Sequence, residues 1–386
     1  MPIKVHWFLP TSGDSRTLLG SARVLAKGSR ADDDVPGDRP ASVEYLGLVA
    51  RTAEDLGFEA ALTPTGTWCE DAWIATAALT QVAQKLKFLV AFRPGLQSPT
   101  LAAQAAATFQ RMSHGRLLLN TVIGGDDAEQ RRFGDYLGKD DRYARADEWL
   151  TAVRGAWSGQ PFTFDGEFVK VDEAFVINPP QWPEIYLGGA SPAALRVASR
   201  QADVFLTWGE PPEQVAEQIE RVRVLADQEE RTLRYGIRLH VVSRERADDA
   251  WAAATRLLDG ADQEIIDSVQ SVLQGAVSEG QKRQLALHGG RKDDLVVSPN
   301  LWAGLGLLRP GAGVALVGSH EEVADRIAEY HALGIDEFIF SGYPHLEEAL
   351  HVGEGLFPVL RRRGLLAGRD GVVRAAEAEA GAAVPA

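Results

Sequence analysis

Arginine, histidine and tyrosine side chains stand at the ends of two apolar segments in this chain of 386 residues. Arg238 and His240 are separated by one residue within the first segment. Tyr343 and His345 directly follow the second. Alternate residues of a β-strand share a face, so Arg238 and His240 should point to the same side. Guanidinium groups bind oxyanions, and imidazole exchanges a proton near neutral pH, which makes these four residues candidates for a catalytic site.

Structural roles are the alternative for these residues. Arg238 and His240 could form a core pair in which a carboxylate holds Arg238. A buried arginine costs free energy unless an anion is close to it, so we favour a functional pair. His345 could simply pack or cap near the start of a helix, where the positive helix end disfavours a charged imidazole.

Cys69 is the only cysteine and follows the apolar segment 58–62. Its thiol could be a nucleophile, but a lone cysteine is more often a small buried apolar residue, and we expect it to line a pocket. One cysteine excludes an intrachain disulfide framework and favours a reducing compartment. A cytoplasmic protein is therefore expected.

A glycine-rich turn could hold a phosphate group. Gly188, Gly189, Ala190 and Ser191 follow a strand-like segment and precede a helix that Pro192 would open. Glycines let backbone N–H groups approach an anion, and the helix dipole adds to the attraction. The turn is not the GxGxxG dinucleotide pattern, and adjacent glycines also occur in ordinary turns.

Strand-like and helix-like segments alternate along the chain, which predicts an α/β fold with a parallel sheet. We predict strands at residues 5–9, 58–62, 87–92, 116–122, 185–187, 204–207, 234–242 and 337–340. Helices are predicted at residues 43–56, 73–82, 100–112, 142–157, 192–200, 211–226, 248–258 and 346–360. Eight strands favour a closed TIM (β/α)8 barrel, whose active site lies at the carboxyl ends of the strands.

Three segments interrupt the alternation, at about 20–40, 160–180 and 260–318. The first is polar and would be a lid or disordered, and the second should hold a hairpin that turns at Asp165 and Gly166. We expect one barrel domain over residues 1–368 with these insertions. The Ala-, Glu- and Gly-rich segment 369–386 should be a flexible tail or pack on a partner chain.

Lys and Arg total 40 against 54 Asp and Glu, a formal net charge of −14. This charge repels nucleic acid and anionic membranes. The chain shows no apolar run of about 18 residues and no signal peptide. Its 8 histidines form no HxH or HExxH pair, so no metal site is expected.

Several motifs together resemble the alkanesulfonate monooxygenases, over roughly residues 3–358. The matching segments are Trp-Phe-Leu-Pro-Thr at 7–11, Pro-Thr-Gly at 64–66, Cys-Glu-Asp-Ala-Trp at 69–73, Arg-Pro at 93–94, Trp-Gly-Glu-Pro-Pro at 208–212, Gly-Ile-Arg-Leu-His at 236–240, Ser-Pro-Asn-Leu-Trp-Ala-Gly at 298–304 and Ser-Gly-Tyr-Pro-His-Leu-Glu-Glu at 341–348. That family belongs to the bacterial-luciferase-like flavin monooxygenases, which are TIM barrels.

The resemblance implies a two-component enzyme that uses reduced FMN (FMNH2) from a separate NAD(P)H-dependent FMN reductase. With O2 as co-substrate, it would convert an aliphatic sulfonate to an aldehyde and sulfite, as in sulfur acquisition. It also implies a homo-oligomer, a dimer or tetramer. The barrel would have to supply positive charge for the sulfonate and a pocket that excludes water.

The resemblance also assigns residues. It implies an active site made of Arg238, His240, Arg309, Tyr343 and His345, with Cys69 and Trp208 beside them. For FMN it implies phosphate contacts from Tyr143, Gly189, Ala190 and Ser191, and ring contacts from Asn120. Arg309 ends the 260–318 insertion, whose counterpart in the family is a mobile lid.

Two departures leave the substrate open. Thr67 and Trp68 stand where the family commonly has arginine and serine, and the 20–40 segment is longer than the usual connection. A related flavin monooxygenase acting on a sulfonated sugar, another sulfur compound or a non-sulfur molecule is therefore an alternative. An F420-dependent oxidoreductase and a barrel that binds FMN without turnover are further alternatives.

Overall fold

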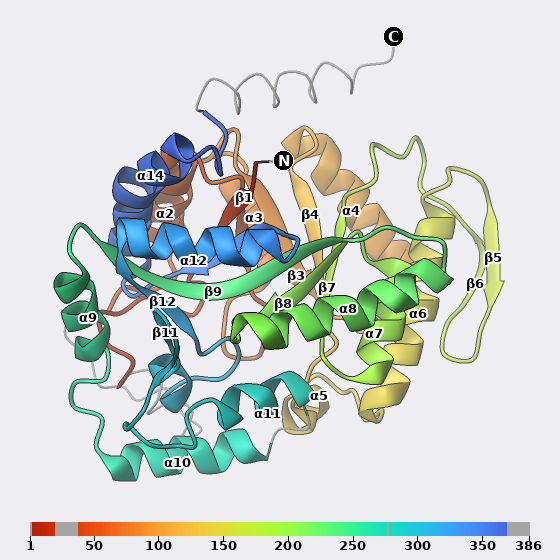
Figure 1. Ribbon diagram of the computed structural model, residues 1–386. Helices are drawn as coiled ribbons and strands as arrows, with labels where there is room; N and C mark the ends of the chain where they lie inside the picture. Colours follow the sequence, from red (N-terminus) through yellow and green to blue (C-terminus); the bar gives the residue numbers. More distant parts are fainter. Residues whose placement is uncertain (1, 20–37, 276–277, 369–386) are drawn as a thin grey trace.

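Eight parallel strands close into a barrel in the computed structural model, which describes residues 2–19, 38–275 and 278–368 (Figure 1). The strands are β1 (Lys4–Phe8), β2 (Ala60–Thr63), β3 (Lys87–Phe92), β4 (Leu117–Thr121), β7 (Ile185–Gly188), β8 (Val204–Trp208), β9 (Arg234–Arg244) and β13 (Ile335–Ser341). Strand β13 pairs with both β9 and β1, which closes the barrel. The predicted TIM barrel is confirmed, and each predicted strand overlaps an observed one.

Helices connect the strands and surround the barrel (Figure 1). They are α2 (Val43–Leu56), α3 (Ala72–Leu79), α4 (Pro99–Ser113), α5 (Asp127–Arg132), α6 (Lys139–Ala156), α7 (Pro192–Gln201), α8 (Pro212–Gln228), α9 (Ala247–Arg256), α10 (Gln263–Gln274), α11 (Glu279–Ala286), α12 (His320–Ala332), α13 (His345–Leu350) and α14 (Phe357–Arg362). Ser42, Asp71 and Ser98 cap α2, α3 and α4 by accepting backbone N–H groups. Such caps satisfy donors that a helix start leaves free, so these short polar residues mark where the helices begin.

The predicted hairpin is present as β5 (Phe162–Asp165) and β6 (Lys170–Ala174), which pair antiparallel. In its turn, the Gly166 N–H donates to the Val169 carbonyl at 2.9 Å. The helix predicted over residues 346–360 consists of α13, a π-helical stretch (His351–Leu356) and α14. The segment 20–40 lies mostly, and the segment 369–386 entirely, outside the described residues.

The last insertion is helical at its start, as the sequence indicates, and then holds short strands that the sequence does not indicate. It contains α10 and α11, then the short strands β10 (Val296–Ser298), β11 (Leu301–Trp302) and β12 (Ala315–Ser319). Strand β12 pairs in parallel with the carboxyl half of β9, outside the closed barrel. Helix α12, which follows it, is absent from the predicted elements although Ser319 and Glu322 form a capping box at its start.

Ionic side chains fill the amino-terminal end of the barrel. Glu337 of β13 accepts from His6 Nε2 at 2.9 Å and from the Tyr186 hydroxyl at 2.6 Å, and it pairs with Arg234. Burial alone would raise the pKa of Glu337, but the hydrogen bond and charge of His6 and the charge of Arg234 lower it to about 2. Glu337 is therefore an ionised carboxylate that links four strands at the end of the barrel where residues commonly serve stability.

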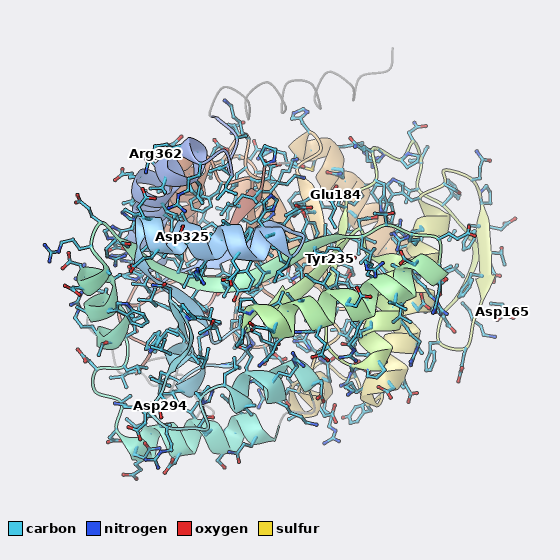
Figure 2. The ribbon with its side chains drawn as sticks, viewed as in Figure 1. Asp165, Glu184, Tyr235, Asp294, Asp325 and Arg362 are labelled. Atoms are coloured by element: carbon cyan, nitrogen blue, oxygen red, sulfur yellow. The ribbon has the colours of Figure 1, made fainter. Side chains whose placement is uncertain are left out.

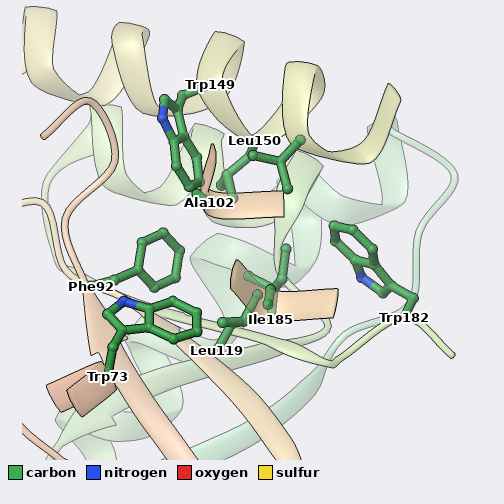
Figure 3. A pocket seen from close by; sticks show the side chains of 10 residues that line it. Trp73, Phe92, Ala102, Leu119, Trp149, Leu150, Trp182 and Ile185 are labelled. Carbon is green, nitrogen blue, oxygen red and sulfur yellow. The ribbon is translucent and has the colours of Figure 1, made fainter. Parts of the chain in front are cut away.

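Aromatic side chains pack between the barrel wall and the helices. Figure 3 shows side chains that line a cavity among them, including Trp73, Phe92, Trp149 and Ile185. The cavity has a volume of about 10 Å³. A space of this size holds at most about one water molecule, so we regard it as core packing and not as a ligand site.

Charged side chains such as Glu184 and Arg362 lie at the outer surface (Figure 2). Among the helices of the described residues, none is both long and apolar enough to span a bilayer.

Candidate active site

Arg238 and His240 lie in the central part of β9, the longest strand of the barrel. His240 is level with Ser341 at the end of β13, and Arg238 is level with Trp208 at the end of β8. Both side chains are buried. Parallel strands thus bring these residues to the end of the barrel where active sites form.

His240 is held by hydrogen bonds on both ring nitrogens. Its Nδ1 lies 2.7 Å from the Ser341 hydroxyl, and its Nε2 lies 3.1 Å from the Ala312 carbonyl oxygen and also contacts the Arg309 guanidinium. Burial, followed by the charges of Arg309 and Arg238, holds the pKa of His240 well below its usual value. The imidazole is therefore neutral at physiological pH.

Arg238 lies without a carboxylate partner. Its Nη1 donates to the Leu239 carbonyl at 2.8 Å, and its Cζ lies 4.8 Å from the centre of the Phe8 ring. Burial and the charge of Arg309 lower the pKa of Arg238 to about 9, so it remains charged at neutral pH. Within the described residues, neither arginine forms an ion pair with Asp or Glu, and the carboxylate-held core pair considered from the sequence is not observed.

Tyr343 and His345 continue the cluster from the end of β13. The Tyr343 ring stacks on His240 with ring centres 5.6 Å apart, and Arg309 Cζ lies 5.9 Å from the Tyr343 ring centre. His345, the first residue of α13, meets the Tyr343 ring edge-on at 5.0 Å. The structure therefore brings Arg238, His240, Arg309, Tyr343 and His345 together.

Asp14 also belongs to this cluster, although the sequence did not single it out. The carboxylate lies in the segment after β1 and accepts from both the backbone N–H and Nδ1 of His345, each at 2.8 Å. The two residues are 331 positions apart, so local spacing could not reveal the contact. A polar residue soon after a barrel strand was the only signal available.

Cys69 lies in the loop after β2. Its sulfur is 3.8 Å from the Pro64 carbonyl oxygen and 3.7 Å from that of Gly66. Burial raises the pKa of the Cys69 thiol to about 11, so the nucleophilic thiolate is scarce at neutral pH. This environment suits a pocket-lining thiol better than a nucleophile.

Helix α11 covers the barrel end beside Trp208. Gln284 of this helix donates to the Gly209 carbonyl at 2.9 Å and accepts from the Gly313 N–H at 2.9 Å. Arg283 forms an ion pair with the buried Glu210, and a Cβ on Gly280 would lie only 3.2 Å from the Trp208 ring. Helix α11 thus connects the end of β8 to the loop that carries Arg309.

A second group of predicted residues lies at the start of α7. Gly189 has φ +151°, and a Cβ there would lie 2.5 Å from Ala194 Cβ and 3.0 Å from the Tyr143 hydroxyl. Ser191 caps α7 by accepting from the Ala194 N–H, and Ala190 is buried beside it.

Burial raises the pKa of Tyr143 to about 12, so its hydroxyl keeps its proton. A glycine turn, a helix amino terminus and a hydroxyl donor together suit a phosphate group. Asn120 lies on β4, which pairs directly with β7, the strand that leads into this turn. The predicted cofactor residues therefore occupy neighbouring strands and connections, and their types fit a flavin nucleotide.

A closed parallel barrel that carries guanidinium and imidazole groups at the carboxyl ends of its strands is typical of TIM-barrel enzymes. The sequence profile of luciferase-like monooxygenases matches residues 3–337, and the chain belongs to that family.

Solved structures agree on the fold. A riboflavin lyase (RcaE) with modified FMN and riboflavin has a TM-score of 0.77 and 19% identity, covering 95% of this chain and 93% of that one. A long-chain alkane monooxygenase (LadA) has a TM-score of 0.75 and 16% identity, with coverage of 95% and 93%. An F420-dependent secondary alcohol dehydrogenase has a TM-score of 0.65 and 16% identity, with coverage of 93% and 99%.

Proposed function

We propose that the protein is an FMNH2-dependent monooxygenase that cleaves an aliphatic sulfonate to an aldehyde and sulfite, with O2 as co-substrate. The observation that carries this proposal is the pair Arg238 and Arg309, which have no carboxylate partner in the described structure and lie beside the neutral His240. Two free guanidiniums at the end of a barrel create a site for an oxyanion.

The residues of the cluster would have separate roles in binding and catalysis. Arg238 and Arg309 bind the sulfonate oxygens, because planar guanidinium groups match oxyanions in bidentate contacts. Tyr343 donates or accepts a hydrogen bond at the reacting group, and His240, whose ring nitrogens are already engaged, positions Arg309. Trp208, under α11, helps to exclude water, while Cys69 lines the pocket as a neutral thiol.

The turn at the start of α7 would bind the FMN phosphate through Gly189, Ala190 and Ser191, with the Tyr143 hydroxyl as a further donor. Asn120 would contact the ring system from β4. When bound, reduced FMN supplies the electrons that activate O2. A separate NAD(P)H-dependent FMN reductase would provide it in the cytoplasm.

Sulfite release tests the proposal directly. Methane- to decanesulfonate, a taurine-like amine and a sulfonated sugar are supplied with FMN, NAD(P)H, O2 and a generic flavin reductase. Sulfite formation that needs both the protein and the flavin supports desulfonation and ranks the chain length. Binding of reduced FMN without sulfite from any member would exclude these sulfonates as substrates.

A flavin monooxygenase with a different substrate, such as a sulfonated sugar, another sulfur compound or a non-sulfur molecule, is the second candidate. It is favoured by Trp68, which replaces a small polar residue expected from the resemblance and is 47% exposed. An F420-dependent enzyme shares the fold, and titration with both reduced cofactors separates the two. A barrel that only stores FMN would have no need for the arginine pair.

We further propose that two copies associate through the face formed by α3 and α4. Ile74 is 75%, Leu101 53% and Met112 65% exposed on this face. These side chains border a groove of about 360 Å³ whose lining residues are all uncharged. Exposed apolar patches of this kind usually mark an interaction surface.

The charges around this face suit a second copy of the chain. Glu70 and Asp71 lie at the amino end of α3, and Arg111 lies at the carboxyl end of α4. None of the three forms an ion pair with a described residue. In a twofold dimer with antiparallel helices, the acidic end of one copy would face the basic end of the other.

A further inference from the structure

Asp14 and His345 form a buried pair next to the arginine cluster. The Asp14 side chain is fully buried, and its backbone exchanges two hydrogen bonds with Arg39, at 2.9 and 2.8 Å. Its Oδ1 accepts from His345 Nδ1 at 2.8 Å and from the Ser15 N–H at 2.9 Å. Its Oδ2 accepts from the His345 N–H at 2.8 Å and from the Tyr45 hydroxyl.

These contacts determine which nitrogen of His345 carries the proton. An ionised carboxylate only accepts hydrogen bonds, so Nδ1 must be the donor. Burial would raise the pKa of Asp14, but the charge and hydrogen bonds of His345 lower it below its ordinary value. In its neutral form the His345 ring therefore has its lone pair on Nε2, and this atom has no hydrogen bond to any described residue.

Aromatic neighbours hold the ring in place. Phe8 stacks on His345 with ring centres 5.6 Å apart, and Tyr343 meets it edge-on at 5.0 Å. A ring fixed by two aromatic contacts and a two-point contact with Asp14 cannot rotate to exchange its nitrogens. Such an arrangement resembles the way a buried aspartate orients a catalytic histidine in hydrolases.

The two imidazoles of the cluster experience opposite charges. His240 contacts the Arg309 guanidinium and lies near Arg238, which disfavour an added proton. His345 instead contacts the carboxylate of Asp14. Two like groups in opposite environments commonly have different acid–base roles.

We propose that Asp14 is a positioning residue that keeps the proton of neutral His345 on Nδ1, and that Nε2 of His345 is the site's proton acceptor. The role of Nε2 in turnover rests on the proposed monooxygenase function. Asp14 acts through His345 and need not touch the substrate. This assignment separates the proton-handling imidazole from His240, which interacts with the arginine pair.

Other ionisable groups surround the pair. The Tyr45 hydroxyl donates to the Asp14 carboxylate and accepts from Arg39, which also pairs with Glu347 of α13. Nearby, Glu348 of α13 pairs with Arg244, and the Tyr343 ring contacts both His345 and His240. Any change in the pH profile must therefore be compared with a variant of one of these neighbours.

The experiment compares Asp14→Asn with Glu347→Gln. An asparagine keeps the size of Asp14, but its NH2 group can donate to Nδ1 and so move the His345 proton to Nε2. Glu347→Gln removes a neighbouring carboxylate that has no contact with His345. Nitrogen NMR of labelled histidine reports the tautomer, circular dichroism reports folding, and anaerobic titration reports FMNH2 binding.

We expect the Nδ1–H form of His345 in the unchanged protein and in Glu347→Gln, and the Nε2–H form in Asp14→Asn. Sulfite turnover of Asp14→Asn should fall by about 10²–10⁴-fold, the usual contribution of a general acid or base, with KM and FMNH2 binding little changed. The pH dependence of kcat should change in Asp14→Asn only.

Three results would overturn the inference. The first is an Nε2–H tautomer of His345 in the unchanged protein. The second is an Asp14→Asn variant with an unchanged kcat and pH profile, because Asp14 would then only hold the start of α13. The third is equal loss in both variants. If the unchanged protein releases no sulfite from any sulfonate, the proposed function fails separately, and the NMR comparison still decides whether Asp14 sets the tautomer.

Discussion

The guanidinium of Arg309 lies directly against Nε2 of His240, and both groups reach the same carbonyl oxygen, that of Ala312. One residue comes from the end of the 260–318 insertion and the other from the central part of β9. Through this contact the positive charge of Arg309, on the insertion, affects the protonation of His240, on the barrel. It explains why the pKa of His240 depends on Arg309 as well as on burial.

Replacing Arg309 should affect both catalysis and the titration of His240. In Arg309→Ala, sulfite release should fall by about 10²–10³-fold, as for the loss of one donor to a developing charge. The pKa of His240 should rise, because the second of its lowering causes has been removed. Enzyme assays and histidine NMR titration measure the two effects.

Arg291→Ala is the matched control for Arg309→Ala. Arg291 is an exposed arginine of the same insertion, and among the described residues it forms an ion pair with Asp293 alone. This variant should keep its turnover and the ordinary His240 titration. Unchanged sulfite release in Arg309→Ala would remove Arg309 from the proposed site.

Cys69→Ser should keep substantial activity. The pKa of the Cys69 thiol is raised to about 11, so little thiolate is present at neutral pH, and serine can keep similar contacts with the Pro64 and Gly66 carbonyls. Sulfite assays and the rate of alkylation between pH 7 and 11 measure both points. Complete loss of turnover would restore the nucleophile hypothesis.

Much of the barrel could be predicted because its information is local. Apolar runs such as those of β3 and β9 alternate with helical patterns, and a β-turn between Asp165 and Gly166 marks a hairpin. Strand β12 escaped prediction because it is short and lies within a long insertion, and helix α12, which directly follows it, was missed with it. The pairing of β12 with β9 depends on tertiary contacts that periodicity does not contain.

In the candidate site, too, local features could be predicted from the sequence and contacts between distant segments could not. Residues on or next to strands, such as Arg238 and Tyr343, could be found from their positions at the ends of apolar segments. Asp14 and the contact of Gln284 with Gly209 could not, because their partners are distant in the sequence. The charge state of His240 could not be predicted either, since its lowered pKa depends on the three-dimensional position of Arg309.

The α3–α4 face predicts a change in oligomeric state on substitution. Ile74→Glu places a charge in the uncharged patch and should shift the protein to the monomer in light scattering after gel filtration. Ile177→Glu is the control, because Ile177 is 70% exposed and is not among the residues that line the groove. A monomeric parent protein, or equal dissociation by both changes, would contradict this interface.

Glu337→Gln should destabilise the barrel without direct effect on the site. Removing the carboxylate leaves Arg234 and His6 without their common anion, and breaking a buried ion pair costs about 3–5 kcal/mol. Denaturant unfolding measures this free energy. Asp336→Asn is the control, since Asp336 is partly exposed and contacts only His331 among the ion pairs described.

The same carboxylate predicts how stability depends on pH. The pKa of Glu337 is lowered from its ordinary 4.5 to about 2 in the folded protein. A lowered carboxyl pKa stabilises the fold at pH values above the unfolded pKa, and this contribution is lost as the pH falls from 4.5 towards 2. Acid unfolding of the parent protein should therefore steepen in this range, whereas Glu337→Gln should lose that part of the dependence. Identical acid profiles for the two proteins would show that Glu337 is not ionised at the barrel end.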